Sequence, residues 1–312
     1  MSIASRIGLG FSPTHTRQAL DLIARAEAAG VGTAWTVMSP IDRDTVTVLA
    51  AAAVQAKRIN LGTSVVPALT RHPLALATQV LALEDLAPGR IRLGIGTSHQ
   101  LSMISAYGLP FDRPLAQLRE YLQVIRPLLQ KGSFSFAGDF YKGEATFRST
   151  PGTPVLISAL GQKSFELAGE MADGAISWVC PPSYLQTIAL PAMRRGAEKA
   201  GRPVPPLVAH VLVAPSRNID RVREAARTIL EYYRMRPFYR NMFAAAGYPT
   251  EFDQPVSEEL IDALVLSGDD QVIMEGLRQR LEEWADELVI GVVPGDDLRA
   301  AEDSVLQLIG KL

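Results

Sequence analysis

The chain has 312 residues, of which 47% are hydrophobic and 21% are charged, and it contains one cysteine, Cys180. These proportions exclude a disordered chain, and a single cysteine excludes an intramolecular disulfide framework and a cysteine-rich zinc site. The 31 basic and 33 acidic residues give a net charge of −2. This balance argues against a nucleic acid or an anionic membrane as partner, because both select for clustered basic residues.

Short β-branched segments alternate with longer segments of helical periodicity along most of the chain. Strands are predicted at 7–11, 33–37, 59–66, 91–96, 155–159, 175–179, 207–213 and 287–293. Helices are predicted at 16–29, 45–56, 73–86, 115–129, 162–171, 183–200, 220–243, 257–266, 269–285 and 297–312. A period-two segment at 134–141 predicts a small hairpin around Gly138.

Eight strands, each followed by a helix, predict an α/β fold of the (β/α)8 TIM-barrel type, for which about 250 residues suffice. An open doubly wound sheet would carry a glycine fingerprint in its first turn, whereas this chain has Phe11-Ser12-Pro13-Thr14 there. We therefore predict one barrel domain over residues 1–312, with an insertion before the last strand. The N-terminal segment lacks the features of a signal peptide, and no apolar run approaches the length of a membrane span, so we expect a cytoplasmic protein.

Catalytic groups of a TIM barrel lie at the carboxyl ends of its strands. His15, His72 and His99 follow predicted strands, so each is either a site residue or an ordinary polar loop residue. His210 falls inside a strand and is expected to pack in the barrel. No carboxylate accompanies the histidines at metal-ligand spacing, and the chain lacks the GxSxG motif of serine hydrolases, so neither a metal site nor a hydrolase is predicted.

Two segments suggest a binding site at these strand ends. The stretch 61–67 (LGTSVVP) ends a strand in small polar residues, and the stretch 156–164 (LISALGQKS) runs from a strand through Gly161 directly into a helix. The exposed N–H groups of such a helix start, with Lys163 and Ser164 beside them, suit an anion such as a phosphate. A plain strand-to-helix turn explains the same residues equally well.

Several blocks together resemble the luciferase-like monooxygenase superfamily of barrel flavin and deazaflavin enzymes. The strongest block is 58–99, RINLGTSVVPALTRHPLALATQVLALEDLAPGRIRLGIGTSH. Supporting blocks lie at 19–35, 107–129, 136–141 and 154–178. Within the superfamily, GIGTSH, LPFDRP and ALGQKSFELAGEMADG are most similar to the branch that uses coenzyme F420.

The resemblance implies a barrel that holds the deazaflavin ring at its carboxyl-terminal mouth and transfers a hydride through the C5 atom of the ring. It also implies a non-prolyl cis peptide at Ser64–Val65 behind the ring and a phosphate at the helix start after Gly161. The cofactor-binding residues implied in this way are Thr63, Ser64, Val65, Gly96, Thr97, Ser98, His99, Ala159, Leu160, Gly161, Gln162, Lys163, Ser164, Trp178 and Val179.

The chain departs from the dehydrogenases of the F420 branch, which have a histidine just after strand two and a glutamate after strand four. Here the corresponding segments are Trp35-Thr36-Val37-Met38 and Gly96-Thr97-Ser98-His99. We therefore expect an F420H2-dependent reductase of an activated C=C or C=N bond in a small organic substrate, with His99 and His72 as the candidate catalytic proton donors. The alternatives are a two-component FMN monooxygenase and a non-enzymatic barrel that only binds a flavin or a partner.

The segment 232–266 is the predicted insertion. Its first part, 232–248, contains six of the 21 aromatic residues of the chain, together with Arg234, Arg236 and Arg240. One interpretation is a lid, whose aromatic residues cover an apolar substrate and whose arginines meet the acidic tail of F420. The other is ordinary helix packing or a contact of the homodimer that is common in this family.

Overall fold

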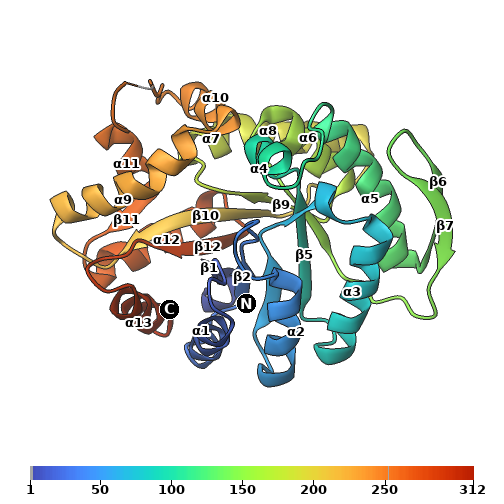
Figure 1. Ribbon diagram of the computed structural model, residues 1–312. Helices are drawn as coiled ribbons and strands as arrows, with labels where there is room; N and C mark the ends of the chain where they lie inside the picture. Colours follow the sequence, from blue (N-terminus) through green and yellow to red (C-terminus); the bar gives the residue numbers. More distant parts are fainter. Residues whose placement is uncertain (1–2, 252) are drawn as a thin grey trace.

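The computed structural model describes residues 3–251 and 253–312, in which eight main strands form a closed parallel barrel surrounded by helices (Figure 1). These strands are β1 (Ile7–Phe11), β2 (Thr33–Thr36), β3 (Asn60–Thr63), β5 (Ile91–Gly96), β8 (Val155–Ser158), β9 (Gly174–Ser177), β10 (Leu207–Ala214) and β12 (Glu287–Val292). Each pairs in parallel with the next, and β12 pairs with β1, which closes the sheet. The predicted (β/α)8 fold is confirmed.

The main helices pack around this barrel and bury one face each against it. They are α1 (Thr16–Ala28), α2 (Thr45–Gln55), α3 (Pro73–Leu86), α5 (Pro114–Lys131), α6 (Gln162–Met171), α8 (Leu190–Lys199), α9 (Ile219–Arg234), α12 (Asp270–Glu283) and α13 (Leu298–Ile309). Shorter helices are α4 (Gln100–Ser105), α7 (Pro182–Tyr184), α10 (Pro237–Ala245) and α11 (Glu258–Leu264). Among the described residues, no helix combines the length and the apolar character needed to span a membrane.

Between β10 and α12 the chain forms α9, α10, α11 and the short strand β11 (Val265–Ser267), which pairs with β10, and the predicted insertion 232–266 falls in this part. A single helix over 220–243 was predicted here, and that prediction is wrong at Arg236, which is extended with φ −97° and ψ 125°. The next residue is Pro237, and a proline disfavours helical geometry in the residue before it. The chain therefore turns between α9 and α10.

Other boundaries also differ from the prediction. The predicted strand 59–66 ends at Thr63, and the chain resumes pairing as β4 (Val66–Pro67) beside β5 after the cis peptide. The predicted helix 257–266 ends at Leu264, and α4 lies in a stretch predicted to be a loop. The hairpin is longer than predicted, with β6 (Ser133–Ala137) paired to β7 (Lys142–Thr146) outside α5 (Figure 1).

The barrel interior is filled by few large side chains. A buried cluster of Trp35, Leu156, Ile176, Val208 and Val289 occupies its middle. Trp35 is accommodated because glycines at positions 8 and 62 face it, and a Cβ atom at either position would lie within 3.0 Å of the indole.

A polar network lies at the amino-terminal end of the interior. The indole N–H of Trp35 donates to a Glu287 carboxylate oxygen at 2.8 Å, and the other carboxylate oxygen accepts from Arg92. The Arg92 guanidinium also lies over the Trp35 ring, 4.7 Å from its centroid. The side chains of Arg92 and Glu287 are only 20% and 11% exposed, so this network closes the end of the barrel opposite to the strands' carboxyl ends.

Replacing Glu287 by alanine should lower the free energy of unfolding by about 2–4 kcal/mol, because it leaves a largely buried guanidinium and an indole N–H without their partner. Urea denaturation at neutral pH measures this loss. The matched control is Lys311→Ala, which breaks an ion pair to Asp270 whose side chains are 56% and 47% exposed, and should cost less than about 1 kcal/mol. Equal losses in the two variants would contradict the assigned role of Glu287.

Candidate functional site

The carboxyl ends of the parallel strands meet at one end of the barrel, which we call the mouth. The Ser64–Val65 peptide after β3 is cis, as the family resemblance implied. The Thr63 hydroxyl donates to the carbonyl oxygen of Gly94 at 2.7 Å and accepts from its N–H at 2.9 Å, so it joins β3 to β5. The Ser64 hydroxyl is buried with no hydrogen-bond partner among the described residues. Of these two hydroxyls, only that of Ser64 is left for a ligand.

The loop after β5 contains Gly96, Thr97, Ser98 and His99. A Cβ atom at Gly96 would lie 2.8 Å from a Val65 methyl group, so this glycine permits close packing of the two loops. Ser98 is left-handed, with φ +62°. Such backbone geometry is unfavourable for residues other than glycine and is often found at functional sites.

His99 is a neutral imidazole at pH 7. Burial lowers the pKa of its ring to about 4, and the nearby positive charge of Arg236 contributes to this lowering. Its ring lies 6.0 Å from that of Tyr239 on α10. In this state His99 can donate a hydrogen bond, but it does not carry the extra proton of an imidazolium acid.

Helix α6 begins directly after β8. The backbone N–H groups of Gln162 and Lys163 have no acceptor among the residues that the structure describes. Gly161 is extended, and a Cβ atom built on it would meet nothing within 4 Å. The Ser164 hydroxyl is already engaged, since it accepts from the N–H of Leu160 at 3.1 Å and donates to the carbonyl of Gly161 at 2.7 Å. The helix start therefore offers two free N–H donors and open space, without the Ser164 side chain.

Trp178 and Val179 follow β9. The backbone of Val179 is left-handed, with φ +53°. The side chains of Val179 and Ala159 are each 1% exposed, so only their backbone atoms can face a ligand. Trp178 is half-buried and stacks on His210, with a centroid separation of 3.7 Å and an interplanar angle of 20°. Its indole N–H donates to the hydroxyl of Tyr233 at 2.7 Å.

The three histidines that follow strands do not come together. His72 precedes α3, accepts from the N–H of Leu74 and meets the Tyr141 ring at 5.5 Å. His99 contacts α10 instead, and His15 is exposed before α1. Within the described ranges, no group of three or more His, Cys, Asp or Glu residues could hold a metal ion.

The insertion contacts the mouth through an aromatic cluster of Tyr233, Tyr239 and Phe243. The Tyr239 ring packs against those of Tyr233 at 4.8 Å and Phe243 at 6.0 Å. Tyr233 also accepts the hydrogen bond of Trp178, and Tyr239 meets His99. The cluster therefore joins α9 and α10 to the loops after β9 and β5.

Two of the arginines in this segment are engaged locally. Arg234 pairs with Glu231 and donates to the carbonyl of Glu251 at 2.9 Å. Arg236 stacks on the Tyr232 ring at 3.8 Å and donates to the Tyr232 carbonyl at 3.1 Å. The positive charge of Arg236 also contributes, after burial, to the lowered pKa of His99.

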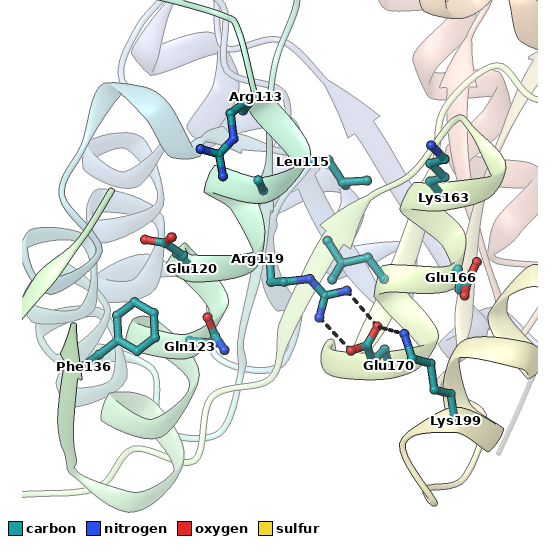
Figure 2. Close-up of a pocket in the computed structure, with 12 residues that line it drawn as sticks. Arg113, Leu115, Arg119, Glu120, Gln123, Phe136, Lys163, Glu166, Glu170 and Lys199 are labelled. Atoms are coloured by element: carbon teal, nitrogen blue, oxygen red, sulfur yellow. Dashed lines mark hydrogen bonds and ion pairs between the residues drawn. The ribbon is translucent and has the colours of Figure 1, made fainter. Parts of the chain in front are cut away.

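A cavity of about 520 Å³ lies on the outer side of the barrel between α5 and α6 (Figure 2). Arg119 reaches across it and binds both carboxylate oxygens of Glu170, at 2.6 and 2.7 Å, and Lys199 approaches the same carboxylate at 3.8 Å. The Arg119 hydrogen bonds lower the pKa of Glu170. Lys163 stands at the upper edge in Figure 2, next to the α6 start. Because Arg119 and Lys199 both pair with Glu170, this cavity carries a structural ion network.

Sequence reasoning did not identify the contact between Trp178 and His210. The sequence could have predicted that His210 faces the barrel interior. Alternate residues of a strand face the same side, and His210 lies two residues after the interior residue Val208. A glycine at position 291 of the neighbouring strand faces it, since a Cβ atom there would lie within 3.0 Å of Nε2. The sequence could not show that the aromatic residue stacked on it would be Trp178.

Comparisons with known proteins agree with this architecture. The model of the luciferase-like monooxygenase family matches residues 2–287. An F420-dependent glucose-6-phosphate dehydrogenase of Nakamurella multipartita is 31% identical over 262 residues, which cover 80% of this chain and 76% of that protein. A 5,10-methylenetetrahydromethanopterin reductase of Archaeoglobus fulgidus is 25% identical over 331 residues, with 98% of each chain covered.

A similar solved structure is that of the coenzyme F420-dependent tetrahydromethanopterin reductase of Methanopyrus kandleri. It has a TM-score of 0.79 at 22% identity, and the match covers 98% of this chain and 97% of that one. At this identity the likeness concerns the fold.

The left-handed geometry of Ser98 leads to a stability prediction. Ser98→Gly should raise the free energy of unfolding by about 0.5–1 kcal/mol, since glycine adopts φ +62° without steric cost. Val179→Gly is the matched comparison: it relieves the same geometry but removes a side chain that is 1% exposed, so its net effect should be a loss of stability. Denaturant unfolding of both variants checks this, and a less stable Ser98→Gly would contradict it.

The lowered pKa of His99 predicts a pH dependence of stability. The unfolded chain binds a proton at this residue below its usual pKa of 6.5, whereas the folded chain does so only near 4, so stability should fall as the pH drops from about 6.5 to 4. His99→Gln should reduce the slope of unfolding free energy against pH in that window by up to about one proton. Urea titrations at several pH values measure the slope. Identical slopes in both proteins would show that folding does not lower the pKa of His99.

Proposed function

The chain belongs to the luciferase-like monooxygenase family, and on that premise we propose that it is an F420-dependent oxidoreductase that reduces an activated C=C or C=N bond of a small organic substrate. The main support for the cofactor is the 31% identity to a relative that is named as F420-dependent. The curated relatives described above give no corresponding support for FMN.

The free helix start of α6 carries the cofactor assignment in structural terms. F420 has a phosphate in its side chain, and the unpaired N–H groups of Gln162 and Lys163, together with the open space at Gly161, suit a phosphate. Lys163 is exposed beside them and adds a positive charge. With a net charge of −2, the chain attracts an anion by such local groups and not by a general basic surface.

The remaining mouth residues would place the ring. The Ser64–Val65 peptide and Gly96 would form the wall behind the deazaflavin ring. Ser98 and His99 would lie along one edge of the ring, and Trp178 would lie at its inner end. Reduced F420 would supply the hydride; the protein would orient the ring, exclude water and provide a hydrogen-bond donor. Of the two candidate donors, His99 is favoured because it meets the aromatic cluster over the mouth, whereas His72 meets Tyr141.

The direction of the reaction is proposed from the residues at the carboxyl ends of β2 and β5. Val37 and Met38 come directly after β2, and Ser98 and His99 lie after β5, so the histidine and glutamate of the F420-dependent dehydrogenases have no counterparts at these positions. A reductase needs no base to remove a hydroxyl proton. The hydride would come from reduced F420, the proton that completes the product would come from water, and the neutral His99 would hydrogen-bond to the substrate. Residues 1–312 would then form one catalytic barrel with 232–266 as its lid, because the aromatic cluster lies across the mouth loops.

The phosphate assignment is tested by Gly161→Asp. An aspartate at this N-cap position stabilises the helix start, but its carboxylate occupies the anion site and repels a phosphate, so we expect F420 to bind at least about tenfold more weakly. Fluorescence titration of the cofactor measures the dissociation constant.

Gly161→Asn is the matched control, because it has the same size and capping ability without the charge, and its effect on F420 should be smaller. The deazaflavin core without the phosphate should bind wild type and Gly161→Asp equally. Unchanged F420 affinity in Gly161→Asp would place the phosphate elsewhere, and failure of the wild-type protein to bind F420 at micromolar concentration would refute the proposed function.

A further inference from the structure

His210 is a buried polar residue with no role in the barrel packing or the proposed chemistry described so far. It lies on β10, points into the barrel and is 6% exposed. Its Nδ1 atom is buried and has no hydrogen-bond partner among the residues that the structure describes. The imidazole ring stacks on the indole of Trp178, with 3.7 Å between the ring centroids.

This lack of a partner contrasts with the other end of the interior. There the polar groups of Trp35, Arg92 and Glu287 satisfy one another. Buried polar atoms in proteins are nearly always hydrogen-bonded, and an exception calls for a specific explanation. The chain also makes room for this imidazole with a glycine at position 291, where any larger residue would collide with it. The glycine accounts for the room that the imidazole occupies, and the unpartnered Nδ1 leaves a hydrogen-bonding position for a molecule other than the protein.

The position of His210 identifies where such a partner would enter. Its neighbour Ala209 pairs with Ser177, the last residue of β9, so His210 is level with the mouth on that side. In the closed strand order β10 lies opposite β3, so His210 is on the wall across the mouth from the Ser64–Val65 peptide. A molecule between these walls would meet the flat indole of Trp178 and the edge of the imidazole together.

We propose that His210 is a ligand-binding residue, which forms a hydrogen bond with a carbonyl or N–H group at the edge of a flat conjugated ring that packs against Trp178. The inference rests on the proposed function, since the ring is either the pyrimidine edge of the deazaflavin or a flat acceptor bound beside it. Burial lowers the imidazole pKa to about 3, so the ring is neutral and offers one donor and one acceptor nitrogen, which match either group.

Access to His210 is coupled to the insertion. Trp178 covers one face of the imidazole, and the hydroxyl of Tyr233 on α9 holds the indole N–H. A ring that reaches Nδ1 therefore has to shift the indole. Its arrival should be visible as a change in tryptophan fluorescence that is independent of any reaction.

The test compares His210→Phe with wild type in three measurements. Phenylalanine keeps a flat ring on Trp178 and removes both nitrogens. The first measurement is the midpoint of thermal unfolding without ligand, the second is the dissociation constant of oxidised F420, and the third is that of menadione, a flat conjugated diketone, added to the F420-loaded protein. His15→Phe, at an exposed histidine before α1, is the control for the substitution itself.

We expect His210→Phe to unfold at a higher temperature than wild type, because it removes a buried nitrogen without a partner. We also expect it to bind one of the two probes about threefold to tenfold more weakly, which corresponds to one hydrogen bond. The probe whose binding is weakened shows whether His210 contacts the deazaflavin or a flat acceptor bound beside it. In isotope-labelled histidine spectra, the His210 nitrogen signals, which the variant lacks, should shift when that probe binds.

Two results would overturn the inference. A lower unfolding temperature with both affinities unchanged would make His210 a structural residue. If the unfolding temperature is unchanged or higher and both dissociation constants are unchanged, the partner of His210 is a trapped water molecule and not a ligand. If wild-type protein does not bind F420, the proposed function fails before the variant is compared, so the two failures are distinguishable.

Discussion

The barrel interior is narrow, and the large side chains inside it are possible only because glycines on neighbouring strands face them. Trp35 lies among glycines at 8 and 62, and His210 lies over Gly291. This arrangement divides the interior into two ends with different properties. The apolar cluster fills the middle of the barrel, and the pairing of Arg92 with Glu287 closes its amino-terminal end. At the carboxyl-terminal end, Ser64 and His210 have buried polar atoms without partners among the described residues, and these are available to a ligand.

Electrostatics at the mouth are local and mostly neutral. The ionised groups of the chain pair largely with one another at the surface, as Arg119 does with Glu170. At the mouth, by contrast, burial keeps the imidazoles of His99 and His210 uncharged at pH 7. A neutral site with hydrogen-bonding groups suits a flat uncharged ring system, while the positive end of α6 is separate from it and suits an anion.

The insertion is physically linked to the mouth, and this link runs through aromatic contacts. Tyr233 holds Trp178, which stacks on His210, and Tyr239 meets His99. A movement of α9 and α10 would therefore change the surroundings of both histidines together. Through Tyr233 and Tyr239 these two helices therefore form part of the surroundings of the mouth loops.

The sequence by itself determined the repeating order of strands and helices, because hydrophobic periodicity and residues such as Pro73 and Gly30 act locally. The bounds of β1, β5, α3 and α6 were predicted without error for this reason. Family blocks around Ser64 and Gly161 also indicated a cis peptide and a helix start, and the structure contains both. What the sequence could not supply is contact across the barrel. Strand register and barrel closure decide whether His72 and His99 share a site and which residue stacks on His210, because they bring together residues far apart in the chain. Only the tertiary structure decides these contacts, since no local pattern encodes the distance between opposite walls of a barrel.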